Sequence, residues 1–532
     1  MLFYTWSFAL FMLVVLPVFL ALRGTRWWLP WLLAASYFFY GWWNPYYLLL
    51  VVYSTTLDYL LVALMDHSPR ERPSGGLWAR TLRGPSDGVL RTAFALSATL
   101  SLALFATAAF GPPSLRPTLL VFGGLVLLMA AGARLASRRL WLVISIVNNL
   151  ALLLFFKYAR FVVENLNAVL GWSHAGLRFP DPSTLMPHGW EYVLPVGISF
   201  FTFQSMSYTI DFYLGNAPRE RNFLRFATFV CFFPQLMAGP IERARQILPQ
   251  FRQPPAFRIE NLTDGLSLFL VGLFKKVAIA NYLAIYVDRA YDNPAAFGAT
   301  RLALATVAFA WQIFFDFSGY TDMARGVARA MGFHLILNFN NPYLAAGLGE
   351  FWQRWHISLS TWFRDYLYIP LGGNRRGWFL TYRNLFIVFL ISGIWHGSAW
   401  TFAIWGALHA LGILLTRELE RSDFYRERVP RPLKQAWVFA FVCFAWIFFR
   451  AASLPDAMLI VRRLFTAAWN APQAPALMVL LVASVWAYQI VCESRARALL
   501  RLGVVRVGLA SAMILYLGLC ATGGQPFIYF QF

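Results

Sequence analysis

The sequence predicts an all-α protein that crosses a membrane many times, and three observations support this fold class. Hydrophobic residues make up 59% of the 532 positions and charged residues only 13%, whereas a soluble chain carries about 25% charged residues. Apolar stretches long enough to cross a bilayer as helices recur along the whole chain. The basic residues behind the net charge of +21 gather between those stretches, as they do in membrane proteins. The positive charge therefore indicates membrane orientation rather than a nucleic-acid partner.

The apolar runs predict about 11–14 transmembrane helices. The first run has no basic leading region and no small-residue cleavage site, so we interpret it as a retained helix. The runs lie near residues 1–22, 27–43, 46–65, 92–110, 117–133, 140–160, 191–213, 263–287, 302–320, 384–397, 399–415, 435–450, 475–491 and 505–521.

The basic loops orient these helices. With the N-terminus outside, the loops rich in Lys and Arg fall inside, among them Gly215–Asn261, Thr321–Arg383 and Thr416–Lys434. If Asn384–Leu415 were one long helix, the last of these loops would face outward. We therefore predict two short helices that turn near Gly397–Ser398. The number of crossings then places both termini on the extracytoplasmic side.

The whole chain, residues 1–532, is predicted to be a single membrane domain with two unusual parts. Residues 66–139 suggest an atypical insertion with a cytosolic loop and two extra spans, and residues 522–532 form an extracytoplasmic aromatic motif. Two inside segments, Phe223–Pro240 and Gly349–Gly373, are too apolar for ordinary loops and are predicted to be re-entrant or interfacial helices. Irregular backbone at membrane depth is tolerated only where it is buried in protein or lines a cavity. These segments therefore predict a cavity that opens to the cytosol.

Two of the seven histidines are candidate catalytic residues. His396 lies in ISGIWHGSAW, beside Gly393 and Gly397, whose small size lets another backbone or a narrow ligand approach closely. His356 lies in FWQRWHISLSTWFRDYLYIPLGGNRRG. An interfacial aromatic belt explains the tryptophans of this segment, but not the density of its polar residues. The remaining histidines are expected to be solvated or structural: His67, His174, His188, His334 and His409.

The other polar residues and the absence of known motifs limit the kinds of reaction that the chain can catalyse. The four cysteines lie far apart in apolar segments without metal-ligand or disulfide spacing, so we expect no metal and no bound prosthetic group. The sequence contains no HExxH, P-loop, GxGxxG or GxSxG motif. Histidine is then the near-neutral base, which suits removal of a proton from a hydroxyl as it attacks an activated acyl group. Other polar residues at membrane depth are expected to pair and hold helices together: Asp58, Lys157, Asp211, Asp316 and Asp322.

At RWHISLSTWFRDYLYIPLGG and SGIWHG the sequence resembles the membrane-bound O-acyltransferase (MBOAT) superfamily, and it looks most like the bacterial alginate O-acetyltransferase-like branch. The resemblance continues in LPVGISFFTFQSMSYTIDFYLG, CFFPQLMAGPIERARQILPQF, FDFSGYTDMARG and the terminal FIYFQF. It implies a ring of tilted transmembrane helices, with re-entrant or interfacial helices, around a central tunnel. The sequence departs from the family at residues 66–139, where a short basic loop is usual.

The resemblance also implies an activity, which would be that of an O-acyltransferase. Acetyl-CoA would be the cytosolic donor substrate, and an extracytoplasmic polysaccharide would be the acceptor. A separate SGNH-type acetyltransferase or similar accessory protein would complete the transfer. The chain would lie in the cytoplasmic (inner) membrane of a bacterium, among membrane lipids and without nucleic acid.

Carried over residue by residue, the resemblance assigns the site. His396 would be the general base, and His356 would orient or stabilise the thioester carbonyl. Arg375 and Arg376 suit the phosphates of the coenzyme, although anchoring of the membrane protein on its inner side explains them as well. The full set of expected donor-binding residues is Arg354, Trp355, Arg364, Asp365, Arg375, Arg376 and Trp395.

The chain ends in PFIYFQF, with four aromatic residues in seven. Tyr529 lies eight residues beyond Ala521, at the end of the last span, which allows an extended reach of roughly 27 Å. Half of the hydrocarbon core is only about 15 Å thick, so the tail can return toward His396. A tyrosine hydroxyl is easier to deprotonate than serine and its ester is a better leaving group. Tyr529 is therefore a candidate acetyl relay, and an aromatic anchor at the outer interface is the alternative.

Two other functions remain open on the sequence. The same fold suits D-alanyl transfer or acylation of a lipid. In a different class, a polytopic transporter or flippase would also place polar residues at membrane depth. Transporters often show two related halves with interrupted helices, and the sequence has no such internal symmetry.

Overall fold

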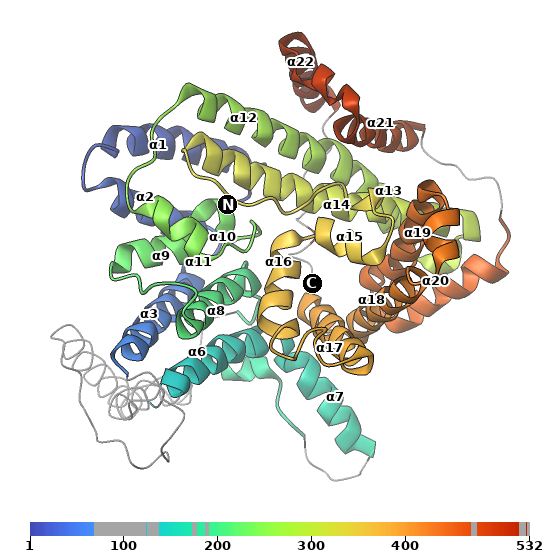
Figure 1. Cartoon of the computed structure of the whole chain (residues 1–532), viewed down its shortest axis with the longest axis horizontal. Coiled ribbons are helices and arrows are strands. Elements are labelled where there is room, and N and C mark those ends of the chain that lie inside the picture. The colour runs from blue at the N-terminus through green and yellow to red at the C-terminus, as the bar shows by residue number, and fades with distance from the viewer. Residues whose placement is uncertain are drawn as a thin grey trace. The chain divides into compact units, whose positions relative to one another are not determined.

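The computed structural model describes residues 1–68, 124, 138–172, 178–186, 191–469, 476–520 and 528. Every regular element in these ranges is helical, which confirms the predicted all-α class (Figure 1). The predicted insertion at residues 66–139 and the motif at residues 522–532 lie almost entirely outside the described residues.

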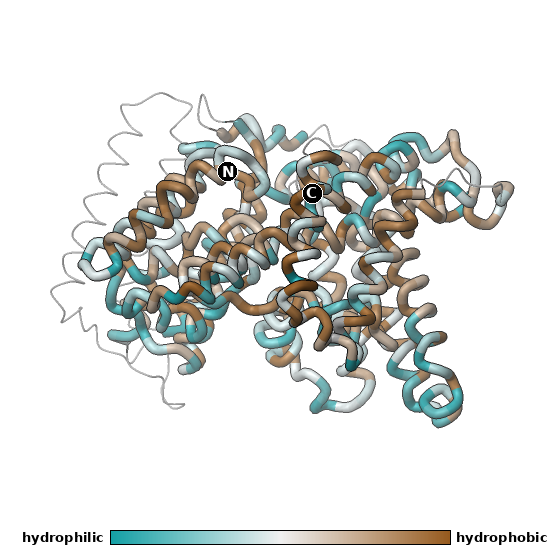
Figure 2. Tube along the Cα trace, turned by 90° about the horizontal axis from the view of Figure 1, so that it is seen from above, coloured by the Kyte–Doolittle hydropathy of each residue, from teal (hydrophilic) through white to brown (hydrophobic). Residues whose placement is uncertain are grey.

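Eight helical stretches among the described residues are long and apolar enough to cross a membrane. Trp6–Leu22 and Ala476–Val491 are shorter apolar helices. Figure 2 shows hydrophobic residues along most of the helices and hydrophilic residues gathered in loops and at helix ends. A multi-pass membrane protein is therefore confirmed. The eight stretches are Pro45–His67, Arg138–Trp172, Ile259–Tyr291, Ala299–Ala330, Trp378–His396, Trp400–Leu419, Arg431–Arg450 and Gly503–Cys520.

The chain divides into two compact units. The first contains residues 1, 17–237 and 243–254. Helix α1 (Trp6–Leu22) begins in the second unit and ends in the first. The other α-helices of the first unit are α2 (Trp28–Gly41), α3 (Pro45–His67), α6 (Arg138–Leu153), α7 (Ala159–Trp172), α8 (Ile198–Leu214), α9 (Phe223–Cys231), α10 (Phe233–Leu236) and α11 (Ala244–Ile247). Its short π- and 3₁₀-helices are η1 (Leu154–Tyr158), η2 (Pro182–Leu185) and η3 (Leu248–Phe251).

A buried carboxylate joins three helices of the first unit. Asp58 of α3 accepts hydrogen bonds from Ser145 of α6 (2.7 Å) and Asn149 of α6 (2.9 Å), and also from the hydroxyl of Ser205 of α8. Buried polar groups are tolerated when such partners satisfy them. Asp58 therefore holds helices together, as predicted for the polar residues at membrane depth.

The second unit contains residues 2–16, 238–242 and 255–532. Its α-helices are α12 (Ile259–Leu273), α13 (Asn281–Tyr291), α14 (Ala299–Ala330), α15 (Leu348–Arg354), α16 (Ile357–Phe363), α17 (Trp378–His396), α18 (Trp400–Leu419), α19 (Arg431–Arg450), α20 (Leu454–Thr466), α21 (Ala476–Glu493) and α22 (Gly503–Cys520). Its π- and 3₁₀-helices are η4 (Phe274–Ala280), η5 (Pro294–Ala296), η6 (Pro342–Leu344), η7 (Arg364–Tyr368), η8 (Phe424–Arg428) and η9 (Arg495–Arg501).

Glycines bring α12 and α14 into backbone contact, and the two helices lie side by side in Figure 1. A Cβ on Gly272 would lie 2.5 Å from the carbonyl oxygen of Gly319, and one on Gly265 would lie 2.6 Å from that of Gly326. The two pairs are seven residues apart on each helix and run in opposite directions. Small residues at such spacing let antiparallel helices pack without intervening side chains. This close contact also holds η4, which follows directly after α12, next to α14, so that side chains of η4 can reach side chains of α14.

The hairpin of α17 and α18 has the predicted form. Helix α17 ends at His396 and α18 begins at Trp400, so the turn lies at residues 397–399. A Cβ on Gly393 would lie 2.4 Å from the carbonyl oxygen of Phe402. The predicted close approach at this glycine is therefore real, and it is made by the neighbouring helix. His396 is consequently placed at the turn of a tightly packed hairpin.

Each of the two predicted re-entrant segments is divided into short helices. Residues 349–373 contain most of α15, all of α16 and η7. Residues 223–240 contain α9 and α10. None of these helices is long enough to span a bilayer, so the prediction of non-spanning segments agrees with the structure. Their depth in a membrane stays a prediction.

Some helix boundaries were predicted wrongly. The span predicted at residues 140–160 continues as a helical stretch from Arg138 to Trp172, because the π-turn η1 carries the helix past the polar Lys157. The span predicted at residues 191–213 begins as a helix only at Ile198. Gly197 before it has a φ of +77°, a backbone conformation that does not continue an α-helix.

Candidate active site

His356 begins helix α16 in a strained backbone conformation. Its φ is +43°, a left-handed geometry that costs residues with a side chain about 1–2 kcal/mol. Non-glycine residues keep such conformations where the surrounding structure enforces them, often at functional sites. Here a hydrogen bond of the next residue helps to hold this backbone conformation, because the amide of Ile357 donates to the carbonyl of Asn338 (2.9 Å).

Asn338 also fixes the imidazole of His356. Its side-chain oxygen accepts from the backbone amide and the hydroxyl of Ser358, at 3.1 and 3.0 Å. The same oxygen lies 3.2 Å from Nδ1 of His356. Because this oxygen is an acceptor, Nδ1 must carry the proton, and in the neutral ring Nε2 is then an acceptor. The fold therefore selects both the orientation and the tautomer of His356.

The surroundings of His356 are apolar. The side chain is fully buried, and its ring lies 4.7 Å from that of Phe317 and 6.2 Å from that of Phe339. Burial lowers the pKa of His356 to about 3, because removal from water penalises the charged form. His356 is therefore a neutral imidazole at physiological pH.

His396 is the last residue of α17 and is 3% exposed. Its ring is surrounded by those of Trp395 (4.9 Å), Trp405 (5.1 Å) and Phe449 (5.4 Å). These rings come from α17, α18 and α19. Three helices therefore converge on the imidazole, which matches the predicted burial of His396.

Trp395 connects the two candidate histidines. Its ring lies 6.5 Å from that of His356 and 4.9 Å from that of His396. Residues 40 positions apart in the sequence thus meet one buried indole. The structure places both predicted catalytic histidines, together with the predicted donor-binding Trp395, in one aromatic cluster. No such proximity could be read from their spacing.

His409 is a third buried imidazole in the same unit. It lies on α18 among the rings of Trp352 (5.1 Å), Trp405 (4.7 Å) and Phe441 (5.9 Å). Neither of its ring nitrogens has a hydrogen-bond partner in the part of the chain that the structure describes. The shared ring of Trp405 separates it from His396. This packing agrees with the structural role expected for His409.

Two residues of the site were not anticipated. Asn338, described above, lies on the irregular segment between α14 and η6, where no periodicity marks it. On the same segment the amide of Ile336 donates to the buried carboxylate of Glu242 (2.7 Å). Burial raises the pKa of Glu242 to about 7, a shift opposed by the Ile336 amide and the nearby Arg325. The signals available in the sequence were polar residues within largely apolar stretches, Asn338 in LILNFNNP and Glu242 in GPIER.

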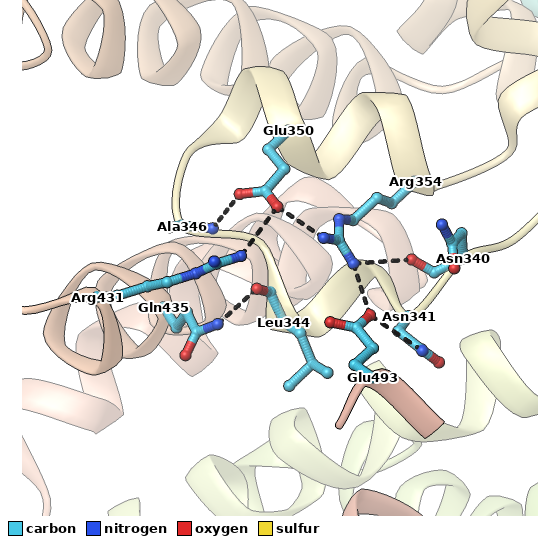
Figure 3. Close-up of polar contacts among 9 residues, drawn as sticks. All are labelled: Asn340, Asn341, Leu344, Ala346, Glu350, Arg354, Arg431, Gln435 and Glu493. Carbon is cyan, nitrogen blue, oxygen red and sulfur yellow. Dashed lines mark hydrogen bonds and ion pairs between the residues drawn. The ribbon is translucent and has the colours of Figure 1, made fainter. Parts of the chain in front are cut away.

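Arg354 is occupied by ion pairs that Figure 3 shows. Its guanidinium lies 2.8 Å from Glu350 and 2.8 Å from Glu493 of α21. Glu350 in turn meets Arg431 of α19 (3.5 Å). The network ties α15 to the segment around Asn340, whose amide donates to the carbonyl of Arg354 (2.9 Å). This Arg354 network stabilises the segments on either side of His356 and Asn338, and donor binding by Arg354 stays a prediction.

The other predicted donor-binding residues are scattered over this region. Trp355 is buried in the aromatic cluster, 5.2 Å from the ring of Trp446. Arg364 pairs with its neighbour Asp365 (2.8 Å). Arg375 and Arg376 are exposed in the turn before α17, which suits either coenzyme phosphates or lipid headgroups. Tyr529 lies outside the described residues.

No group of three or more His, Cys, Asp or Glu side chains among the described residues is arranged to hold a metal ion. The described site thus offers imidazoles, aromatic rings and hydrogen-bonding groups. Such a set suits proton transfer to and from a bound substrate.

Comparison with known proteins assigns the family. The profile of the MBOAT, membrane-bound O-acyltransferase family matches residues 183–454. This range is just over half of the chain and includes both His356 and His396. The chain belongs to the membrane-bound O-acyltransferase family. It is therefore a multi-pass member of a family of O-acyltransferases, as the resemblance predicted.

Several curated MBOAT relatives are similar to the chain. The probable alginate O-acetylase AlgI of Pseudomonas putida is 43% identical over 339 residues, covering 63% of this chain and 67% of the relative. The peptidoglycan O-acetyltransferase of Helicobacter pylori is 38% identical over 355 residues, covering 62% and 65%. The teichoic acid D-alanyltransferase of Bacillus subtilis is 29% identical over 272 residues, covering 48% and 68%. The match spans 60–67% of the length of the alginate and peptidoglycan relatives.

Proposed function

We propose that the chain is a membrane O-acetyltransferase that moves acetyl groups from cytosolic acetyl-CoA to an extracytoplasmic polysaccharide. The observation that carries the proposal is the meeting of His356 and His396 at Trp395 in one buried cluster of an MBOAT chain. The names of the alginate and peptidoglycan relatives support acetyl as the acyl group and a polysaccharide as the acceptor. D-Alanyl transfer, the activity named for a more distant relative, is the second candidate.

In the proposed reaction, His396 acts as the general base. A hydroxyl oxygen attacks the thioester carbonyl of acetyl-CoA while an imidazole nitrogen of His396 takes its proton. The C–S bond then breaks, an ester forms, and the coenzyme A thiolate receives the proton back from the imidazolium. The thioester is already activated, so positioning and stabilisation of the oxyanion supply most of the remaining rate.

The proposed role of His356 is to orient the reactants. With Nδ1–H donated to Asn338, the neutral ring presents Nε2 as an acceptor. A hydroxyl or an amide of the substrate fits this atom, whereas a carbonyl oxygen does not. Of the two roles predicted for His356, orientation therefore suits the inferred tautomer better than direct stabilisation of the thioester carbonyl.

The first acceptor in this proposal is the hydroxyl of Tyr529. Its acetyl ester would then exchange with a nucleophile of an SGNH-type accessory acetyltransferase, which passes the acetyl group to the polysaccharide. The residue before Tyr529, Ile528, is 3% exposed, so the backbone next to Tyr529 is enclosed by protein, which supports this proposal. The setting proposed is the bacterial cytoplasmic membrane with both termini extracytoplasmic.

Mass spectrometry of the full-length protein incubated with acetyl-CoA tests the donor, the base and the relay together. We expect a mass increase of one acetyl group on Tyr529 in the wild type and none in His396→Ala or Tyr529→Phe. Incubation with a D-alanyl thioester provides the competing arm. A wild-type chain that stays unmodified by acetyl-CoA but accepts D-alanine would replace acetyl with D-alanyl transfer. Acetylation that continues in Tyr529→Phe would exclude the relay and leave His396 to be tested by direct transfer.

A further inference from the structure

A buried ion pair near the middle of two helical stretches contacts Ile528, close to the end of the chain. Lys276 of η4 and Asp316 of α14 have side chains only 1% and 3% exposed, and their charged atoms are 2.5 Å apart. The backbone amide of Ile528 donates to the other oxygen of Asp316 (2.7 Å). The carboxylate therefore has one oxygen on an ammonium group and one on the tail.

The packing of α12 against α14 explains how the sequence builds this pair. The glycine contacts end at Gly272, and the π-turn η4 follows at Phe274–Ala280. Single π-turns within helices are often found at functional sites. Here the turn directs two consecutive lysines toward α14, Lys275 to Asp322 (2.7 Å) and Lys276 to Asp316.

The N-terminal segment completes the surroundings of the pair. The ammonium group of Lys276 lies 5.3 Å from the ring of Tyr4, a distance suited to a cation–π contact. Phe3 packs on Tyr320 of α14, with ring centroids 4.7 Å apart. The surroundings of the pair are therefore built from η4, α14 and the N-terminal residues, and Ile528 is the fourth contribution.

Stability alone does not explain such a pair. Two charges taken out of water gain little over a well-packed apolar pair, so a buried ion pair points to a requirement for its geometry. Asp316 with one oxygen held by Lys276 presents the second as a fixed acceptor for a backbone amide. Such a bond requires no particular side chain at Ile528, but it fixes the position of the backbone at the residue that precedes Tyr529.

We infer that Lys276 and Asp316 form the seat that positions the backbone of the C-terminal segment at Ile528, with Asp316 binding the amide of Ile528 and Lys276 holding Asp316 in place. Both are positioning residues. The consequence for Tyr529 rests on the proposed function, whereas the seating of the tail stands on the contacts above. The two can therefore fail separately.

The neighbouring pair of Lys275 and Asp322 is a matched control. It joins the same two helical segments at the same type of distance, but the side chains are 23% and 14% exposed, and Asp322 also meets Arg325 (3.2 Å). In the described part of the chain, the amide of Ile528 donates to Asp316 and not to Asp322. A general effect of breaking a lysine–aspartate pair would appear in both pairs, and an effect on the tail in only one.

Hydrogen–deuterium exchange of the full-length protein in nanodiscs measures the seating directly. We expect the C-terminal peptide containing Ile528 to exchange at least tenfold faster in Lys276→Leu/Asp316→Leu than in the wild type. In the control Lys275→Leu/Asp322→Leu, its exchange stays within twofold of the wild type. Equal protection in the wild type and in the Lys276/Asp316 variant would overturn the inference, as would an equal rise in both double variants.

If the apolar double variant does not fold, Lys276→Gln/Asp316→Asn provides the same test, because the asparagine oxygen still accepts an amide but without charge. A three- to tenfold rise in exchange of the Ile528 peptide is expected, and a rise below twofold would contradict the inference.

Acetyl transfer measured on the same samples separates the inference from the proposed function. Tyr529→Phe is expected to keep the protected tail and to lose tail acetylation. Loss of protection in the Lys276/Asp316 variant with undiminished acetyl transfer would retain the seat and reject the relay. Unchanged protection with lost transfer would reject the seat and leave the relay in place.

Discussion

His356 and His396 are both buried and both contact the ring of Trp395, yet the fold holds the two imidazoles in different ways. His356 stands at a strained backbone position and is fixed at Nδ1 by Asn338. His396 ends a regular helix at the turn of a hairpin, where aromatic rings from three helices enclose it.

The difference corresponds to the two tasks that the proposed function gives these histidines, which a sequence motif cannot tell apart. A ring whose tautomer is fixed by a hydrogen bond is suited to orienting a partner, because one nitrogen always has the same role. A base must take up a proton and release it within one turnover, so its pKa must lie near the working pH. The neutral, fully buried His356 does not meet that condition, so the proposed function assigns the base to His396. Three measurements test this distinction between His356 and His396.

The largest effect is expected for loss of the base. We predict that His396→Ala lowers the rate of acetyl transfer by about 10²–10⁴-fold, the usual contribution of general acid–base catalysis. The rate is measured with labelled acetyl-CoA on protein that elutes as a single folded species. The comparison between the two histidines would collapse if His356→Ala were the more damaging substitution.

His409→Phe is the matched control for this prediction. The imidazole is buried among rings in the same unit, and neither nitrogen has a partner among the described residues. A phenyl ring fits this environment without leaving a buried polar group unsatisfied. We expect activity close to that of the wild type, which would show that a buried imidazole near Trp405 is not in itself required.

An intermediate effect is expected when His356 loses its support. Asn338→Leu removes the acceptor shared by Nδ1 of His356 and by the amide and hydroxyl of Ser358. Because small displacements of positioning groups cost up to about 10²-fold in rate, we predict a fall in kcat of about 10–100-fold. The KM for acetyl-CoA should change little, since Asn338 does not bind the donor in the proposal.

Asn338→Asp provides the conservative variant for that prediction, because a carboxylate oxygen accepts the same three hydrogen bonds. Part of the activity should return. If Asn338→Asp and Asn338→Leu are equally impaired, or if KM rises instead of kcat falling, Asn338 does not act through the orientation of His356.

The sequence revealed the fold and the two histidines for physical reasons that are local. Hydropathy and the distribution of basic loops act over one helix length, so the hairpin that turns after His396 could be predicted from the position of a basic loop. The histidines stood out because polar groups in apolar flanks need a reason.

Other parts of the site depend on contacts between distant residues, which no local pattern encodes. Asn338 reaches His356 from an irregular segment 18 residues away, and Ile528 reaches Asp316 across 212 residues. Chain length showed only that the tail can return to membrane depth. The partner that receives it, a carboxylate already paired with Lys276, became visible only in three dimensions.

The smallest effect is expected in the dependence of stability on pH. Burial lowers the pKa of His356 to about 3 in the folded protein, whereas the unfolded chain titrates near 6.5. Below pH 6.5 the unfolded state therefore binds a proton that the folded state refuses. The stability linked to His356 is complete above pH 6.5 and is lost as the pH falls from 6.5 toward 3.

At pH 5.0 this loss amounts to about 2 kcal/mol, and His356→Gln, which does not titrate, should escape it. The free energy of unfolding in SDS at pH 7.5 and 5.0 gives the comparison, since other titrating groups contribute equally to both proteins. Equal acid sensitivity of the wild type and His356→Gln would mean that His356 is solvated and takes up protons near neutral pH. In that case the suppressed protonation of His356 would no longer argue against His356 as the base.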